Sequence, residues 1–371
     1  RGTVSCPDMG ALSAKMDNLY DASIDYTVRK KGENQCVGFV ASFIDDRYAP
    51  GGERLLEPAA ALLGELICDP VTYHGRFVPE YFESEKTNLL EAIRSLINDK
   101  RDWADSRLLR ALCDGEAYAV PRLGDEETVD KLQALKVYTQ YRDLISTAPL
   151  EIIYSGSADL ERVKQALAAA FATLPREEVR VISTAEPHVC RESVQYVEDV
   201  LDVTQGKLGM GFSCGSDDMP ALLMGNTLFG GSSNSKLFLN VREKLSLCYY
   251  ASSLYHRQKG LITVSSGIEF QNYQRAYDEI MAQLEAVQKG ELEDWELEGA
   301  RSTLLNSYAT VGDSQGKLEN FYLGQAATGQ HETPADLARA IQDMTAERIC
   351  RAMSTVKLDT VYFLKGKEAE A

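Results

Sequence analysis

The sequence predicts an α+β fold made of two related units, and three observations support this prediction. The chain has 371 residues, a length that suits two domains better than one. Short apolar runs typical of strands alternate with longer segments of helical periodicity. The two halves also end alike, because residues 143–156 and 352–366 both end as an apolar strand that finishes in a glycine. We therefore expect a duplicated unit with an antiparallel-rich sheet and helices on one face.

The first unit is expected over residues 1–176. A helix begins after Pro7-Asp8, because an aspartate at that place caps a helix. Strands are expected at 35–44 and 151–156, and further helices at 55–68, 78–99, 102–114, 128–147 and 159–174. Residues 175–192 contain two prolines and mixed charge without an apolar period, so we expect the interdomain linker there.

The second unit is expected over residues 193–371. Its elements follow in order: strands near 193–200 and 203–214, a helix from Pro220, a hairpin with strands near 249–257 and 261–268, helices near 273–289, 292–310, 314–328 and 345–355, and a last strand at 360–366. This unit has its leading strands, whereas the first unit lacks a matching strand and helix at its start. We therefore expect the first unit to be truncated at its N-terminus.

The charge of the chain excludes some classes of partner. A net charge of −17 argues against binding to nucleic acid or to an anionic membrane. No stretch approaches 18 uninterrupted apolar residues, so no segment is expected to span a membrane. The eight cysteines form no C-x-x-C pair and lie in apolar runs, which is typical of reduced thiols in a cytoplasmic protein.

The histidines give no sign of a metal site. His74, His188, His256 and His331 lie far apart, and no two stand four residues apart as in a helical zinc site. Histidines in such isolated positions are typical of loops and surfaces. We expect no cofactor in this chain and no bound zinc.

Residues 229–250 carry the clearest functional pattern. Gly230 and Gly231 allow a tight turn, and Ser232 is one of three residues there that can cap the next helix. Arg242 falls near the end of that helix, and Tyr249 opens the strand that follows. A guanidinium and a phenol at one helix–strand junction can both donate to a carbonyl oxygen or an oxyanion. From periodicity alone, the pattern is more typical of a capped helix whose arginine pairs with a surface carboxylate.

This segment resembles the second-half signature of the insulinase/pitrilysin family of zinc peptidases. The family pattern is a glycine-rich turn, a Ser-x-Leu-Phe helix start, Arg-Glu-Lys and then Tyr, and here it is GGSSNSKLF followed by REKLSLCY. The resemblance implies two LuxS/peptidase-like α/β sandwich units. It also implies that Arg242 and Tyr249 form the family's catalytic Arg/Tyr pair, with Tyr250 as the one-residue alternative. Gly230, Gly231, Ser232 and Tyr250 are then expected to contact the substrate.

The resemblance does not extend to the family's metal ligands. In active members an H-x-x-E-H helix supplies two zinc ligands, and a Glu on a later helix supplies the third. The resemblance places the first motif before Arg1. On the helix near 78–99 it places Glu85 at an upstream acidic position and Ala92 at the ligand position. A methyl group cannot bind zinc, and Glu91 lies about 100° around the helix. Glu85 and Glu91 are therefore weak metal candidates, more typical of a solvated helix face.

The stretch Val28–Gln35 also departs from active members. Its Lys-Lys-Gly-Glu sequence resembles the degenerate bacterial members of the family, which are associated with modification of elongation factor P. The resemblance covers nearly the whole chain, and Arg242 with Tyr249 is its most specific part.

Three functions fit these observations. The leading hypothesis is a non-catalytic peptidase-like subunit that binds peptide and completes the active site of a zinc-bearing homologue or of a second copy. The alternative is an active zinc metalloendopeptidase whose H-x-x-E-H motif lies upstream of Arg1 and whose third ligand is Glu91 or a shifted Glu. The third is a scaffold without proteolysis, as in core subunits of respiratory complexes with this fold.

Overall fold

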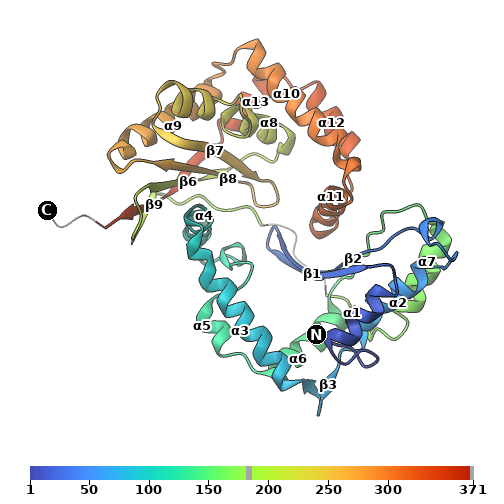
Figure 1. Cartoon of the computed structure of the whole chain (residues 1–371). Coiled ribbons are helices and arrows are strands. Elements are labelled where there is room, and N and C mark those ends of the chain that lie inside the picture. The colour runs from blue at the N-terminus through green and yellow to red at the C-terminus, as the bar shows by residue number, and fades with distance from the viewer. Residues whose placement is uncertain (181–185, 368–371) are drawn as a thin grey trace. The chain divides into compact units, whose positions relative to one another are not determined.

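The computed structural model describes residues 1–180 and 186–367, which group into two compact units. Unit 1 comprises Arg1–Lys30, Gln35–Arg94 and Arg122–Ile182, and unit 2 comprises Lys31–Asn34, Ser95–Pro121 and Ser183–Ala371. Figure 1 labels the main helices and strands of both. No helix among the described residues is long and apolar enough to cross a membrane.

Unit 1 is mainly helical. Its helices are α1 (Met9–Asp17), α2 (Leu56–Cys68), α3 (Pro79–Ser95), α5 (Glu126–Asp130), α6 (Ala134–Thr147) and α7 (Leu160–Ala170). Two two-stranded sheets join them, one of β1 (Ser23–Lys31) and β2 (Asn34–Ser42), the other of β3 (Thr72–Tyr73) and β4 (Arg76–Phe77). Aspartates cap helices as expected, since Asp8 accepts from Ala11 N and Asp159 from Arg162 N. Helices α2 and α7 pack so closely that a Cβ on Gly64 would lie 2.2 Å from Ala170 O.

Unit 2 is built on a five-stranded sheet in the order β5-β9-β6-β8-β7. The strands are β5 (Gln195–Leu201), β6 (Gly206–Cys214), β7 (Cys248–His256), β8 (Leu261–Ile268) and β9 (Val356–Gly366). β5 pairs with β9 in parallel, and the other pairs are antiparallel. The chain thus places β9, its last strand, between β5 and β6, which makes β7 an edge strand.

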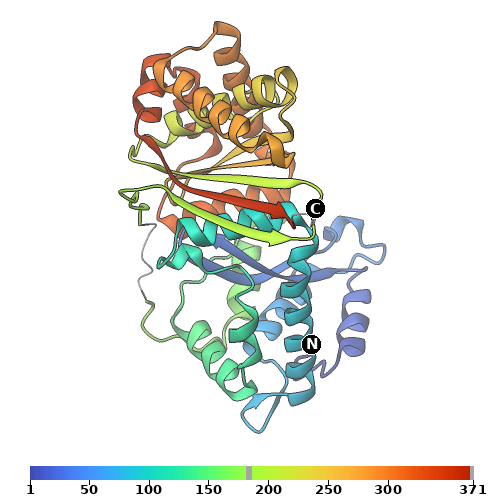
Figure 2. The same cartoon turned by 90° about the vertical axis from the view of Figure 1, so that its left-hand side faces the viewer.

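Helices lie on both faces of this sheet. The helices of the unit are α4 (Lys100–Leu112), α8 (Met219–Phe229), η4 (Leu237–Lys244), α9 (Tyr273–Lys289), α10 (Asp294–Ala309), α11 (Gln315–Thr328), α12 (Pro334–Gln342) and α13 (Ala346–Met353). Along β6, Leu208, Met210 and Phe212 are buried in the core that α8, α9 and α13 share. Figure 2 shows the yellow-to-red helices on that side of the sheet. Gly209 and Gly211 alternate with these residues and face Leu108 and Leu112 of α4.

The structure confirms the α+β class and the two-unit organisation, but it corrects two details. Helices were expected on one face of each sheet, yet α4 covers the second face in unit 2 because Gly209 and Gly211 let it approach closely. Residues 151–156 were expected as a strand, but they form no strand. An apolar run becomes a strand only where a partner offers its hydrogen bonds, and the run itself does not specify one.

The two units are not two consecutive halves of the chain joined by one linker. Residues 31–34 and 95–121 group with unit 2, although the sequence assigned them to the first half. The reason for the larger segment is the apolar side of α4, which packs on the sheet. Within the expected linker 175–192, residues 181–185 lie outside the described residues, and residues 186–191 take part in a buried network described below.

Candidate functional site

One pocket of unit 2 contains both members of the expected Arg/Tyr pair. The pocket has a volume of about 410 Å³, and its lining is polar on the side of the charged residues. The lining residues are Arg242, Glu243, Ser246, Leu247, Cys248, Tyr249, Glu269 and Asn272. Residues 242–249 supply most of the wall, so one short stretch of chain builds the site.

Arg242 is presented by a π-helix. In η4 the hydrogen bonds reach further back than in an α-helix, as shown by Leu245 N, which donates to Asn240 O at 3.1 Å. Leu237 and Val241 on the inner side of η4 are fully buried. Arg242 lies near the end of the helix with its side chain 41% exposed. Short π-helical segments occur often at functional sites.

The guanidinium of Arg242 has two neighbours. Its central carbon lies 4.6 Å from the centroid of the Phe238 ring, and its Nε lies 3.5 Å from Glu243 Oε1. The stack occupies one face of the guanidinium, while the N–H groups lie in its plane and can donate elsewhere. The pair with Glu243 is an exposed contact between residues adjacent in the chain, which contributes little to stability.

Tyr249 is presented by a β-bulge at the start of β7. Cys248 pairs with Ile268 and Tyr250 pairs with Gly267, so Tyr249 is the extra residue between two paired positions. A bulge of this kind turns a side chain away from the regular alternation. The Tyr249 side chain is accordingly prominent on the surface, with 61% of the residue exposed.

Tyr250 has different surroundings. Its ring lies beneath the Arg101 guanidinium at 4.4 Å and 5.7 Å from Lys207 Nζ. Burial raises the pKa of the Tyr250 phenol. The structure thus brings Arg242 together with Tyr249 in one pocket and places Tyr250 against a cationic part of α4 and β6.

The glycine-rich turn has tight internal contacts. A Cβ on Gly230 would lie 2.7 Å from both Leu237 Cδ1 and Ser253 N, and Gly230 O accepts from Ser253 N at 2.9 Å. A Cβ on Gly231 would lie 2.9 Å from Asn226 Nδ2. Ser232 Oγ donates to Thr227 O at 3.3 Å. These contacts hold α8 against η4 and β7. The expected contact of Gly230, Gly231 and Ser232 with substrate stays a prediction.

The residues expected near a family metal lie on α3 in unit 1. Glu85 is exposed, forms an ion pair with Arg1 and accepts from Asn88 Nδ2 at 3.4 Å. Glu91 is exposed, and Ala92 is half-buried one residue further along. These positions agree with a solvated face of a helix, and α3 carries no carboxylate at the expected ligand position.

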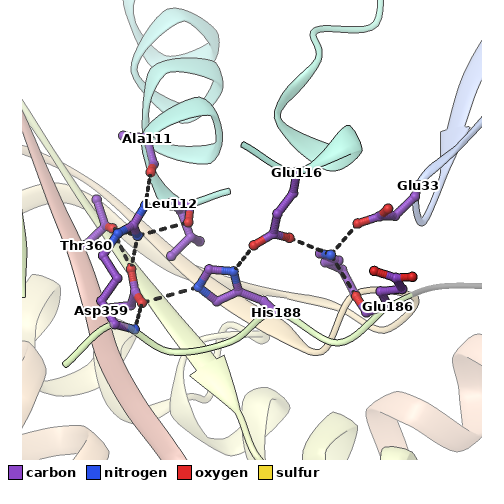
Figure 3. Close-up of polar contacts among 10 residues, drawn as sticks. Glu33, Ala111, Leu112, Glu116, Glu186, His188, Asp359 and Thr360 are labelled. Atoms are coloured by element: carbon purple, nitrogen blue, oxygen red, sulfur yellow. Dashed lines mark hydrogen bonds and ion pairs between the residues drawn. The ribbon is translucent and has the colours of Figure 1, made fainter. Parts of the chain in front are cut away.

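A second feature of unit 2 is a chain of alternating charges in its interior, shown in Figure 3. Lys259, whose side chain is 1% exposed, contacts Glu33 and lies 2.5 Å from Glu116 Oε2. Glu116 Oε1 lies 2.5 Å from His188 Nδ1, and His188 Nε2 lies 3.2 Å from Asp359 Oδ2. Asp359 is fully buried and pairs in turn with Arg191.

The pKa values of Glu116 and Asp359 in this network are both lowered. Burial alone raises the pKa of Glu116, but hydrogen bonds from Lys259 and His188 outweigh it and lower the pKa. For Asp359 burial also acts to raise the pKa, and the backbone N–H of Arg191, Thr360 and His188 together lower it. Arg191 also donates to Ala111 O and Leu112 O, which ties the end of α4 to β9.

Sequence reasoning missed His188. It was expected as a loop or surface histidine, but its side chain is 3% exposed and lies between two carboxylates. The partners come from positions 72 and 171 residues away along the chain, so no local pattern marks them.

Comparison with known proteins defines the family. The chain is 35% identical to "Probable inactive metalloprotease YmfF" of Bacillus subtilis over 99% of this chain and 87% of that protein. Residues 131–304 match the family description "Peptidase M16 inactive domain". The chain belongs to the M16 peptidase family. A second Bacillus subtilis protein, "Uncharacterized zinc protease YmxG", is 20% identical over 84% of the chain and 76% of its own length.

Solved structures match the fold of the whole chain. A conserved protein from Enterococcus faecalis has a TM-score of 0.86 and 25% identity, over the whole of this chain and 88% of that one. The peptidase M16 inactive domain from Pseudomonas fluorescens has a TM-score of 0.78 and 16% identity, over the whole of this chain and 87% of that one, a likeness of fold. The relative at 35% identity and the family match confirm the insulinase-family resemblance read from GGSSNSKLF and REKLSLCY.

Proposed function

We propose that this M16 chain is a non-catalytic, peptide-binding subunit that completes the active site of a zinc-bearing homologue. The observation that carries the proposal is the pocket that holds Arg242 and Tyr249 together. A guanidinium and a phenol in one pocket can donate to a peptide carbonyl as it becomes an oxyanion. The partner is a homologous zinc peptidase subunit, or a second copy of the chain, and it supplies the metal.

Three further observations support the non-catalytic part of the proposal. Ala92 stands where the resemblance places the family's metal-ligating Glu. More than a third of the chain's residues match a domain described as inactive, and the relative with 35% identity is itself named as inactive. The eight cysteines lie in apolar runs without a C-x-x-C pair, a pattern typical of reduced thiols, which supports a cytoplasmic location for the subunit and its partner.

The proposal is tested with the purified chain and its zinc-bearing homologue, mixed and supplied with peptide. Removing one donor to a developing oxyanion typically costs about 10²–10³ in rate. We therefore expect Arg242→Ala and Tyr249→Phe to slow peptide cleavage by that factor without preventing assembly, as measured by steady-state kinetics and gel filtration. Arg242→Lys should recover only part of the rate, because an ammonium lacks the planar fork of donors.

Two variants serve as matched controls. Arg339→Ala removes an arginine that is 76% exposed on α12, and Tyr322→Phe removes a phenol from the surface of α11. Neither should change the rate. Full activity of the Arg242→Ala pair would contradict the proposal. A complex without peptidase activity would indicate a scaffold, and zinc-dependent cleavage by the chain alone would indicate an active peptidase.

A further inference from the structure

Cys113, Glu116 and His188 form a compact group in unit 2, away from the pocket of Arg242 and Tyr249. One ligand-type atom from each residue lies within 4.8 Å of those from the other two. Cys113 is the C-cap of α4, and Glu116 follows three residues later. Cys113 and His188 are buried, and the Glu116 side chain is 26% exposed.

The imidazole of His188 is oriented by Asp359. The fully buried Asp359 carboxylate lies 3.2 Å from Nε2, and this contact turns Nδ1 toward Glu116 (Figure 3). A metal-binding imidazole commonly donates its second N–H to a carboxylate, which fixes the ring and makes the ligating nitrogen more basic. His188 and Asp359 have this arrangement.

Glu116 is oriented in the same way from its other side. Lys259 holds Glu116 Oε2 at 2.5 Å, while Oε1 lies 2.5 Å from His188 Nδ1. The ionised carboxylate therefore presents one oxygen to the group and keeps the other in an ion pair. Lys259 is itself held by Glu33 and by Glu186 O at 2.7 Å, so its ammonium stays in place.

We propose that Cys113 Sγ, Glu116 Oε1 and His188 Nδ1 bind one Zn²⁺ ion. A thiolate, an imidazole nitrogen and a carboxylate oxygen are the ligand types that zinc prefers, and hard cations such as Mg²⁺ prefer all-oxygen sites. Three protein ligands leave the fourth tetrahedral position to water. The ion ties the C-terminal end of α4 to the segment before β5.

Zinc binding displaces protons, because a ligand atom must be deprotonated to bind the metal. In the structure, His188 Nδ1 and Glu116 Oε1 share a hydrogen bond. When Zn²⁺ enters between them, the proton of that hydrogen bond and the proton of the Cys113 thiol are released to solvent. The ion brings two positive charges and two protons leave, so the net charge of the group is unchanged.

This site differs from the zinc site of M16 peptidases, and none of its residues lies on α3. It revises the expectation of a zinc-free chain, which rested on α3 and on pairs of histidines four residues apart. Cys-x-x-Glu is too common a spacing to mark a metal site, and only the fold brings His188 to it.

The test uses the whole chain, freed of metal by a chelator and titrated with Zn²⁺. We expect one zinc per chain by native mass spectrometry and a rise in melting temperature with zinc concentration, since binding to the folded state stabilises it. Mg²⁺ should do neither. Cys113→Ser and His188→Gln should each abolish stoichiometric binding. Cys214→Ser, which removes another buried thiol, and His331→Gln, which removes an exposed imidazole, should keep it.

A spectroscopic measurement on the unmodified chain covers the case in which the variants fail to fold. Co²⁺ bound in place of zinc should show a thiolate-to-cobalt charge-transfer band, because Cys113 is a ligand. The absence of zinc binding or of this band would overturn the proposal. Zinc that is lost on Glu91→Ala but kept on Cys113→Ser would also overturn it and would point to the peptidase metal instead.

Discussion

The geometry of the Arg/Tyr pocket depends on the backbone conformation of Ser246. It joins η4 to β7 and adopts a left-handed backbone conformation with φ 49°. Residues with a Cβ adopt this conformation at a cost of roughly 1–2 kcal/mol, and the cost is highest for β-branched residues. The turn at Ser246 sets the direction of the chain between Arg242 and Tyr249, so the pocket depends on a strained residue.

We predict opposite effects of two substitutions at this position. Ser246→Gly should leave stability unchanged or raise it by up to about 1 kcal/mol, since glycine tolerates the left-handed region. Ser246→Val should destabilise the fold by about 1–2 kcal/mol. Urea unfolding measures both.

Ser302 on α10 provides the matched control, because it is exposed and lies within a helix. At this helical position the order of the two effects should reverse, and Ser302→Gly should lower stability more than Ser302→Val. Equal effects of glycine and valine at Ser246 would contradict this account of the turn.

At the scale of the element, η4 is held at its start by a buried ion pair. Lys236 Nζ lies 3.0 Å from Glu296 Oε1, and the two side chains are 10% and 7% exposed. Glu296 Oε2 also accepts from Glu293 N at 2.9 Å, which caps α10. One carboxylate therefore fixes both the start of the π-helix and the start of α10.

Breaking this pair from one side should be costly. Lys236→Met leaves the Glu296 charge buried without its partner, and we expect a loss of about 3–5 kcal/mol in the free energy of unfolding. Lys236→Met combined with Glu296→Gln should recover part of that loss, because no net charge remains. A double-mutant cycle by chemical denaturation measures the coupling, and additive losses would refute it.

Most helices were predicted from the sequence because their signals are local, but helix α12 (Pro334–Gln342) was not. Asp8, Asp159 and Pro220 mark helix starts that the structure reproduces within a residue or two. The strand expected at 151–156 failed because strand formation depends on a partner elsewhere. The π-helical form of η4 was also not predicted, since its apolar spacing resembles that of an α-helix.

Some residues of the candidate site were predictable from a local pattern, and others were not. Arg242 and Tyr249 lie seven residues apart, so a local pattern could identify them. His188 meets Glu116 and Asp359 only through the fold. Ion pairs between distant segments leave no period or motif in the sequence, and the group around Cys113 was missed for that reason.

At the scale of the whole molecule, each unit has an apolar core of its own. Unit 1 adds a polar anchor near the start of the chain. Glu65 of α2, with a side chain 18% exposed, accepts from Lys15 Nζ and Thr3 Oγ1 at 2.8 Å and from Ser5 N at 3.0 Å. Burial acts to raise its pKa, but these hydrogen bonds outweigh it and lower the pKa of Glu65 to about 2.

The anchor makes the stability of unit 1 depend on pH. A carboxyl whose pKa is lower in the folded state stabilises the fold above its unfolded pKa, near 4.5, and this stabilisation is lost as the pH falls toward about 2. Glu65→Gln should therefore cost about 1–3 kcal/mol at pH 7 and progressively less below pH 4.5.

Denaturation at pH 7 and at pH 3 measures this difference. Glu285→Gln is the control, since Glu285 is 60% exposed in a surface pair with Lys289, and it should have little effect at either pH. A cost at Glu65 that is the same at both pH values would contradict the assignment.

Because one short segment of chain builds most of the Arg/Tyr pocket, that segment can be transferred to another protein as a unit. Most of its wall comes from eight consecutive residues, and the wide helix, the left-handed serine and the bulged tyrosine all lie in one stretch of 20 residues, 230–249. Such a stretch can be inherited, lost or transplanted as one cassette. An evolving lineage could thus discard the metal half of an enzyme and still display this half unaltered, and an engineer could graft the same cassette onto another scaffold with a β-edge and a supporting helix.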